Sequence, residues 1–380
     1  MSQARNMPEI DPAEILADIK QWSGIESPSK DGVAVNKVVD VAEAAMGALG
    51  MSIRRRPGRD GFGDCVVARS PWGGDGPGIL IMAHLDTVHP HGTVDGPLKL
   101  EERDGYLYGP GVYDMKGGAC LGVAALRQLV RAGRETPLPV TYLFTPDEEV
   151  GSPTSRDLIE ELGRQNKYVL VLEPGRDGNK VVTARKGCAR YVVRVHGKPS
   201  HAGVRHKDGV SAILEAARQI AKIEALTDYE TGVTTSVGLW TGGSVVNVRP
   251  AYSEFEVDVR VPDQASAEAT CAVIDGLTPV DPGASIEIEG GMNRPPYART
   301  PEIEALLAHA RTLAAEQGMD LQDTATGGFS DGNFTAAIGT PTLDGLGVDG
   351  DGAHTEQERL LVGSIRPRTQ LLIRLLETLS

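Results

Sequence analysis

The sequence predicts an α/β protein in which an αβα domain with a mostly parallel sheet is interrupted by a smaller α+β domain. Three observations support this expectation. Continuous apolar runs alternate with helical patterns over the first half of the chain, which is typical of parallel strands covered on both faces. Near Lys186 the strand-like segments begin to alternate apolar and polar residues, as strands with one face exposed to water do. A chain of 380 residues also exceeds what one hydrophobic core usually serves.

The elements of the αβα domain follow from local patterns. Asp11 and Pro12 form an N-cap and first-turn pair, which predicts a helix over 11–24. Residues 35–50 repeat the helical period, and the unbroken apolar run 78–86 predicts a strand buried on both faces. The next expected elements are a helix over 116–133, a strand over 140–149, a helix around 157–163 and a strand over 168–175.

The inserted domain has a different pattern. Residues 188–198 and 253–262 alternate in polarity, and the segment 208–226 between them predicts a strong helix. The earlier pattern returns near residue 297 and ends in a helix over 363–379. We therefore expect one domain from residues 1–186 and 297–380, and a second from residues 187–296.

Composition limits the classes of partner. The formal net charge of -14 argues against nucleic acid, which requires a basic face. No apolar run approaches the roughly 20 residues of a membrane helix, so no membrane association is expected. The polar start MSQARNMPEIDP has no apolar signal region, which predicts a cytoplasmic location. The four cysteines form no CxxC pair, so a cysteine zinc site is not expected.

Acidic and histidine residues stand at or just after the ends of the predicted strands. In open α/β sheets, binding sites form beyond the carboxyl ends of strands. Imidazole and carboxylate groups together suit zinc. Each residue also has an ordinary alternative, such as a surface histidine, a solvated Glu–Glu turn or a helix-capping aspartate. The residues concerned are His84, Asp114, Glu148, Glu149 and Glu173, with His354 near the end of the chain.

Seven motifs then occur in a fixed order: HLDTV, GxxDMKGG, DEEVGS, EPG, SHAG, NVRP with a later DVR, and GGFSDGNF. This series resembles the di-zinc metallopeptidase family of carboxypeptidase G, aminoacylase, acetylornithine deacetylase and succinyl-diaminopimelate desuccinylase. The resemblance spans nearly the whole chain, and its motifs are most similar to those of the glutamate carboxypeptidases. It implies a zinc-dependent catalytic domain at 1–186 and 297–380, and a lid and dimerisation domain at 187–296.

The resemblance also implies a metal site with two Zn²⁺ per subunit, for which Co²⁺ or Mn²⁺ could substitute. By position, the metal ligands are His84 and Glu173 for one ion, Glu149 and His354 for the other, and Asp114 for both. Asp86 matches the carboxylate that orients His84, and Glu148 matches the general base. The Asp114–Met115 peptide bond is expected to be cis. His89 and His91, beside the first motif, are expected to be loop residues rather than ligands.

In the second domain the resemblance implies a catalytic role for His201 of SHAG, which would stabilise the oxyanion in the partner subunit's site. The alternative is that His201 caps its own loop. Substrate-binding residues implied in the same way are Asn247, Arg260, Arg294, Gly327 and Gly328. An arginine can hold a substrate carboxylate through two parallel hydrogen bonds, although Arg294 could also be an ordinary surface charge.

The function implied is a homodimeric hydrolase that cleaves the amide bond of an N-acyl or peptidyl amino acid and releases the free amino acid. Glu173 stands where the aminopeptidase branch of the family tends to carry Asp, which favours the carboxypeptidase and acylase branches. A deacylase such as an aminoacylase or acetylornithine deacetylase is the nearest alternative. A non-catalytic binding protein on the same fold is an alternative of another class.

Overall fold

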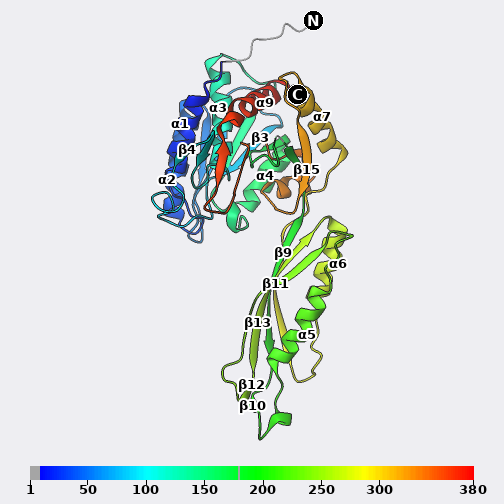
Figure 1. The fold of residues 1–380 in the computed structure, drawn as a ribbon. Coiled ribbons are helices and arrows are strands. Elements are labelled where there is room, and N and C mark those ends of the chain that lie inside the picture. Colours follow the sequence, from blue (N-terminus) through cyan, green and yellow to red (C-terminus); the bar gives the residue numbers. More distant parts are fainter. Residues whose placement is uncertain (1–8, 179) are drawn as a thin grey trace. The chain divides into compact units, whose positions relative to one another are not determined.

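A computed structural model describes residues 9–178 and 180–380. The chain forms two compact units (Figure 1). Unit 1 contains the chain up to Thr183 together with Arg299–Ala325 and Ser330–Ser380, and unit 2 contains Ala184–Ala298 and Thr326–Phe329. The start of the segment used to predict the location, residues 1–8, lies outside the described residues. Within the described part of the chain, no helix has the length and apolar character needed to cross a membrane.

The central sheet of unit 1 has six strands in the order β1-β2-β6-β3-β7-β16. Its parallel part positions the site: β6, β3, β7 and β16 all run in one direction. At one edge β2 is antiparallel to β6, and β1 is in turn antiparallel to β2. The strands are β1 (Ser52–Arg56), β2 (Cys65–Arg69), β3 (Gly78–His84), β6 (Val140–Thr145), β7 (Asn166–Val171) and β16 (Thr342–Leu343).

Helices cover both faces of this sheet, because β3 contributes to a core on each side. Ile79 and Ile81 belong to the larger core, and Leu80 and Met82 to the smaller one. The helices of the larger core are α1 (Pro12–Ser23), α2 (Gly32–Ala48), α3 (Lys116–Arg131), α7 (Pro301–Ala315) and α9 (Ile365–Thr378); those of the smaller core are α4 (Arg156–Gln165) and α8 (Gly332–Ala337). The fold class expected from the sequence, α/β with a mostly parallel sheet, is confirmed.

Two small sheets complete unit 1. A four-stranded sheet has the order β17-β18-β5-β4, and its strands are β4 (Glu101–Arg103), β5 (Tyr106–Tyr108), β17 (Gly350–Asp351) and β18 (Arg359–Leu361). It places the turn that carries His354 beside the loop that precedes α3. The second sheet pairs β8 (Lys180–Arg185) with β15 (Gln322–Thr326). Two short 3₁₀ segments are η1 (Glu148–Val150) and η3 (Val362–Ser364).

Unit 2 is built on a four-stranded antiparallel sheet with the order β11-β13-β9-β14. Alternate residues of β9 and β13 are buried in the core between this sheet and the helices α5 and α6. The residues between them are mostly partly or fully exposed. The elements are β9 (Gly187–His196), β10 (Ser200–His201), η2 (His206–Asp208), α5 (Ala212–Glu224), β11 (Thr234–Gly242), β12 (Val248–Arg249), β13 (Tyr252–Val261), α6 (Gln264–Asp275) and β14 (Ser285–Arg294).

Candidate metal centre and its surroundings

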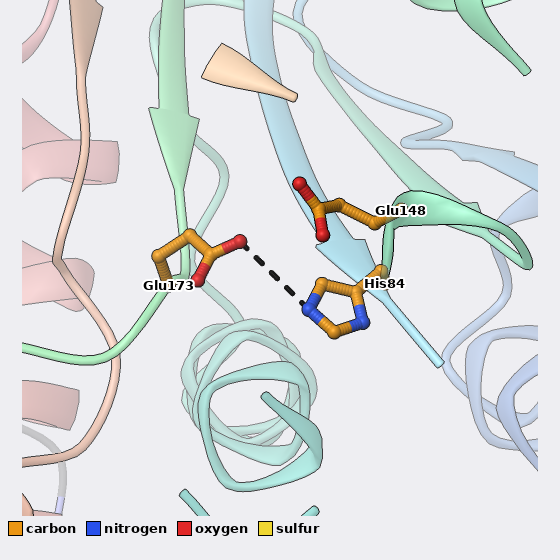
Figure 2. Close-up of side chains that lie close together, drawn as sticks. All are labelled: His84, Glu148 and Glu173. Atoms are coloured by element: carbon orange, nitrogen blue, oxygen red, sulfur yellow. Dashed lines mark ion pairs between the residues drawn. The ribbon is translucent and has the colours of Figure 1, made fainter. Parts of the chain in front are cut away.

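The predicted site residues of unit 1 follow the ends of three neighbouring parallel strands. His84 is the last residue of β3, Glu148 and Glu149 follow β6, and Glu173 follows β7. Because these strands run in the same direction, their carboxyl ends meet at one edge of the sheet. The side chains of His84, Glu148 and Glu173 point toward one another there (Figure 2), with potential ligand atoms within 4.8 Å of each other.

A second group shares His84 with the first. One ligand atom each from His84, Asp114 and Glu149 also lies within 4.8 Å of the others. His84 Nε2 is 3.2 Å from Asp114 Oδ1 and 3.8 Å from Glu173 Oε1. The structure therefore brings together the imidazole and carboxylate groups that the sequence predicted as metal ligands in this unit.

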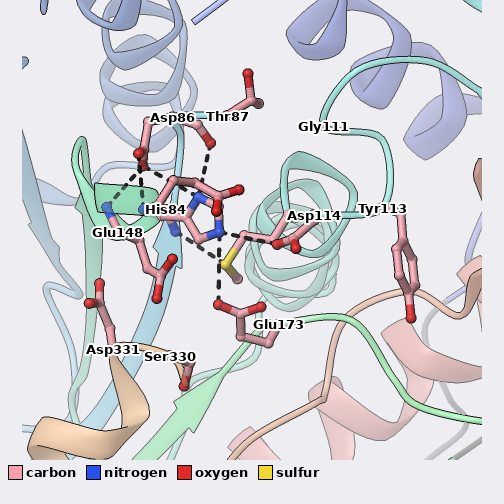
Figure 3. Close-up of polar contacts among 12 residues, drawn as sticks. His84, Asp86, Thr87, Gly111, Tyr113, Asp114, Glu148, Glu173, Ser330 and Asp331 are labelled. Carbon is pink, nitrogen blue, oxygen red and sulfur yellow. Dashed lines mark hydrogen bonds and ion pairs between the residues drawn. The ribbon is translucent and has the colours of Figure 1, made fainter. Parts of the chain in front are cut away.

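Asp86 connects His84 to the turn after β6 (Figure 3). Its carboxylate is fully buried and accepts hydrogen bonds from the backbone N–H groups of Glu148 and Glu149 at 3.1 and 3.2 Å. His84 Nδ1 lies 3.0 Å from the carbonyl oxygen of Asp86. A carbonyl only accepts, so Nδ1 carries the hydrogen and Nε2 faces the carboxylates. Burial opposes a charge on this ring, but the hydrogen bonds to Asp114 and Asp86 outweigh it and raise the pKa of His84 well above its usual value.

The strand before Glu148 is shorter than predicted. We expected a strand over 140–149, but β6 ends at Thr145 and a 3₁₀ turn holds Glu148 and Glu149. Pro146 follows the strand and has no backbone N–H to continue the ladder. The turn closes at Gly151 with φ +98°, a conformation that glycine adopts readily.

Asp114 lies between two histidines. His84 Nε2 faces one carboxylate oxygen, and His354 Nε2 is 3.4 Å from the other. His354 also lies 3.0 Å from Glu149 Oε2, and its backbone has φ +64°, which is uncommon for a residue other than glycine. The Asp114–Met115 peptide bond is cis, which confirms that prediction.

The electrostatics of this cluster fit a cation. Burial and the Asp114 carboxylate raise the pKa of Glu149 to about 8. Hydrogen bonds to Asp114 and Glu149 raise the pKa of His354 to about 11. Negative charge is thus concentrated enough to raise the pKa of one carboxyl and of both histidines in the cluster, so that each favours a bound proton or another cation. A mixed set of imidazole and carboxylate donors suits zinc and similar divalent ions.

The predicted residues of unit 2 form two separate groups. His201 and Asn247 lie on neighbouring segments, since Ala202 N donates to the Asn247 carbonyl at 2.9 Å and His201 pairs with Val248. His201 is exposed, and its Nδ1 accepts from Gly203 N and Val204 N at 3.2 Å each. The contact expected if His201 caps its own loop is thus present. It leaves the hydrogen of the neutral ring on Nε2, which is then a donor.

The second group surrounds Phe329. The guanidinium groups of Arg260 and Arg294 lie 4.9 and 5.1 Å from the centre of its ring. Arg260 also holds Asp258 with hydrogen bonds of 2.7 and 3.0 Å, whereas Arg294 is fully buried, so it is not an ordinary surface charge. Gly327 and Gly328, which we had placed with residues 297–380 in the first domain, belong to unit 2.

Three residues around the centre were not predicted from the sequence. Ser29 Oγ donates to Asp86 at 2.6 Å, and Glu358 accepts from the backbone N–H of Asp114 at 3.0 Å. Burial lowers the pKa of Lys116, next to the Asp114–Met115 pair, to about 8. Lys116 is part of the DMKGG motif and could have been singled out there. No local pattern marks Ser29 or Glu358, because both meet the site only through tertiary contacts.

Comparisons with known proteins agree with this geometry. Residues 80–378 match the sequence profile of peptidase family M20/M25/M40. Carboxypeptidase G2 of Pseudomonas sp. (strain RS-16) is 28% identical over 360 residues, which cover 93% of this chain and 86% of that protein. A succinyl-diaminopimelate desuccinylase of Methylorubrum populi is also 28% identical, over 322 residues that cover 80% of this chain and 82% of the relative.

Solved structures share the fold. An aminopeptidase PepT from Bacillus cereus superposes with a TM-score of 0.79 at 23% identity, and the match covers 97% of this chain and 98% of that one. An M20 family metallo-carboxypeptidase, Sso-CP2 from Sulfolobus solfataricus, gives a TM-score of 0.73 at 15% identity, covering 97% and 99%. At these identities the likeness shows the fold alone.

Proposed function

This chain belongs to peptidase family M20/M25/M40, and we propose that it is a zinc-dependent amidohydrolase that releases a free amino acid from an N-acyl or peptidyl substrate. Members of this family hydrolyse peptide or amide bonds, so the chain is a hydrolase of such bonds. The observation that carries the finer proposal is the convergence of His84, Asp114, Glu149, Glu173 and His354 in unit 1, together with the adjacent Glu148.

We assign His84 and Glu173 to one ion, Glu149 and His354 to a second, and Asp114 to both. Asp114 supports this sharing because its two oxygens face different histidines. When bound, the ions would supply Lewis-acid chemistry, polarising the scissile carbonyl and activating water.

Glu148 is proposed as the general base. It would take a proton from the attacking water and return it to the leaving nitrogen. Its side chain is near His84 and Glu173 in the first group, so a role as a ligand is the competing assignment. Asp86 fixes the backbone of Glu148 through the 3.1 Å hydrogen bond and thereby holds the base in position.

His201 is proposed to stabilise the oxyanion through Nε2, in the site of a partner subunit. The spacing of the two groups in unit 2 supports this. Along β9, Arg260 is paired with Cys188 and Tyr252 with His196, and His201 and Asn247 lie beyond His196. Strands rise about 3.3 Å per residue, so the eight-residue step from Cys188 to His196 spans roughly 26 Å, and the two groups are at least that far apart. One small substrate could not contact both groups of the same subunit.

The surface of unit 2 supports a homodimer. Strand β11 is at the edge of its sheet, and an uncovered edge invites pairing with another chain. Leu239 and Trp240 on this strand, and Val245 and Val246 after it, are exposed hydrophobic residues. Light scattering of the purified protein tests this, and a strictly monomeric protein would contradict it.

A hydrolysis screen tests the proposed reaction. N-acyl amino acids and dipeptides with varied acyl groups and varied amino acids are assayed before and after metal removal. We expect release of a free amino acid that stops with chelation and returns with Zn²⁺. Substrates that end in glutamate are tested first because carboxypeptidase G2 is among the relatives. Preference for a simple acyl group over a peptidyl group would favour the deacylase alternative, which the similarity to a desuccinylase also supports.

A further inference from the structure

We propose that Glu358 is a positioning residue of the metal centre. Its carboxylate would hold the backbone of the 109–114 loop so that Asp114 stays between His84 and His354. The inference rests on the proposed function, because it requires that the cluster bind metal. Glu358 touches neither the substrate nor the ligand atoms in this arrangement; it acts through the loop.

The carboxylate of Glu358 is an internal acceptor for one loop. Glu358 is 1% exposed. Its Oε1 accepts from the backbone N–H groups of Tyr113 and Asp114, both at 3.0 Å, and its Oε2 accepts from that of Gly111 at 3.1 Å. Successive backbone N–H groups that converge in this way form a concave anion site. Here the anion is part of the protein and fixes the loop that ends in Asp114.

His89 completes the set of donors. It is buried, and its Nε2 lies 2.6 Å from Glu358 Oε2. A carboxylate only accepts, so Nε2 carries the hydrogen and donates. The prediction that His89 is a loop residue therefore omitted its contact with Glu358. Four donors thus surround one buried carboxylate, and hydrogen bonds to an ionised acceptor are roughly twice as strong as those between neutral groups.

Glu358 also joins the two loops that carry ligands of the second proposed ion. It stands four residues after His354, and its carbonyl accepts from Gly109 N at 3.3 Å. The next residue, Arg359, pairs with Tyr108 where β18 meets β5. The segment with His354 and the loop with Asp114 are thus held together at this point. Loss of the carboxylate would leave three buried N–H groups without their acceptor, and the loop would have to move.

The competing explanation is that Glu358 only stabilises the fold and does not affect metal binding. Glu215 in unit 2 provides a matched control. Glu215 is also fully buried. It accepts from the backbone N–H groups of Val280 and Asp281 at 2.8 and 3.0 Å, from Gln219 Nε2 at 2.6 Å and from Arg218 Nη1 at 3.5 Å. It resembles Glu358 in burial and in its number of donors, but none of the proposed metal ligands is among its partners.

The experiment compares Glu358→Ala, Glu358→Gln and Glu215→Ala with the wild-type full-length protein. Zn²⁺ affinity is measured by competition with a chromophoric chelator, the Co²⁺ form by its visible absorption, and the metal-free form by thermal unfolding. Substitution of a group that supports a metal ligand typically weakens metal binding by about 10–100-fold. We expect that loss and an altered Co²⁺ spectrum for Glu358→Ala, and wild-type affinity with lowered thermal stability for Glu215→Ala.

Glu358→Gln keeps one oxygen for Tyr113 and Asp114 but presents its NH₂ group to Gly111 and His89. His89 Nε2 can accept from this group after a change of tautomer, whereas the Gly111 N–H loses its acceptor. We therefore expect a smaller loss of affinity, roughly three- to tenfold, which corresponds to one lost hydrogen bond. If Glu358→Ala does not fold, Glu358→Gln decides whether Glu358 affects metal binding. Wild-type affinity and an unchanged Co²⁺ spectrum in the folded Glu358 variants would overturn the inference. A wild-type protein that binds no divalent ion would instead overturn the proposed function.

Discussion

Strands β3 and β9 show how differently the two units hold their candidate residues. Every position of β3 is buried, and the strand ends in His84 at the edge where three parallel strands stop. In β9 buried and more exposed positions alternate, and the residues of interest lie near its two ends. In unit 1 the sheet itself brings the side chains together, whereas in unit 2 the sheet keeps the two groups apart. We therefore expect unit 1 to bind metal by itself and unit 2 to act on the site of a second subunit.

The largest expected effect is in unit 1. Glu148→Gln retains the size of the side chain and removes the basic carboxylate. General-base catalysis contributes about 10²–10⁴-fold, so kcat should fall by at least the lower value while metal content stays near wild type. Turnover and metal content are measured on the same sample.

Glu149→Gln is the control for that result. It changes the neighbouring residue in the same turn, but here we expect weaker metal binding, because a carboxylate ligand becomes an amide. Loss of metal from Glu148→Gln would show that the roles of the two residues are assigned wrongly.

Subunit mixing tests whether unit 2 serves a second subunit. His201→Ala and Glu148→Gln chains, each nearly inactive alone, are unfolded together and refolded. With random pairing, half of the dimers are mixed and each has one complete site, so about a quarter of wild-type activity should return. Mixed dimers that form and remain inactive would refute a shared site.

Substitutions of the two arginines beside Phe329 should change different properties of the protein. Arg260 is partly exposed, so Arg260→Ala should raise KM about tenfold, the effect of losing one charged hydrogen bond to substrate. Arg294 is fully buried, so Arg294→Ala should mainly lower the thermal stability. KM and the unfolding temperature are measured for both variants. A raised KM with unchanged stability in Arg294→Ala would assign substrate binding to that residue instead.

The last pair of predictions concerns the stability of the two strands themselves rather than activity. Ile81→Ala removes a fully buried side chain from β3 and should cost about 2–5 kcal/mol. Val192→Ala on β9 lies at a partly exposed position and should cost less than about 1 kcal/mol. Denaturant unfolding of both variants measures the difference, and similar losses would show that β9 is covered on both faces.

The sequence predicted most where a local pattern and the fold agree. The unbroken apolar run of β3 and the capped helix α1 were located within two residues of their bounds. Strands β1, β2, β11 and β14 were not predicted. Strand β14 is interrupted by Gly290 and Gly291, and β2 has only five residues, too short for a clear period.

The site was predictable to the extent that its residues stand in strand-end motifs. What the sequence could not provide were contacts between distant segments. Glu358 meets Asp114 across 244 residues, and Ser29 meets Asp86 across 57. Such pairs depend on how the loops pack, and no periodicity records them.

A metal-loaded crystal structure tests the central claim most directly. Anomalous scattering at the zinc edge should give two peaks about 3.5 Å apart, as in other two-metal sites. We predict His84 and Glu173 at one peak, Glu149 and His354 at the other, Asp114 at both, and Glu148 at neither. A peak coordinated by Glu148, or peaks away from these side chains, would contradict the account.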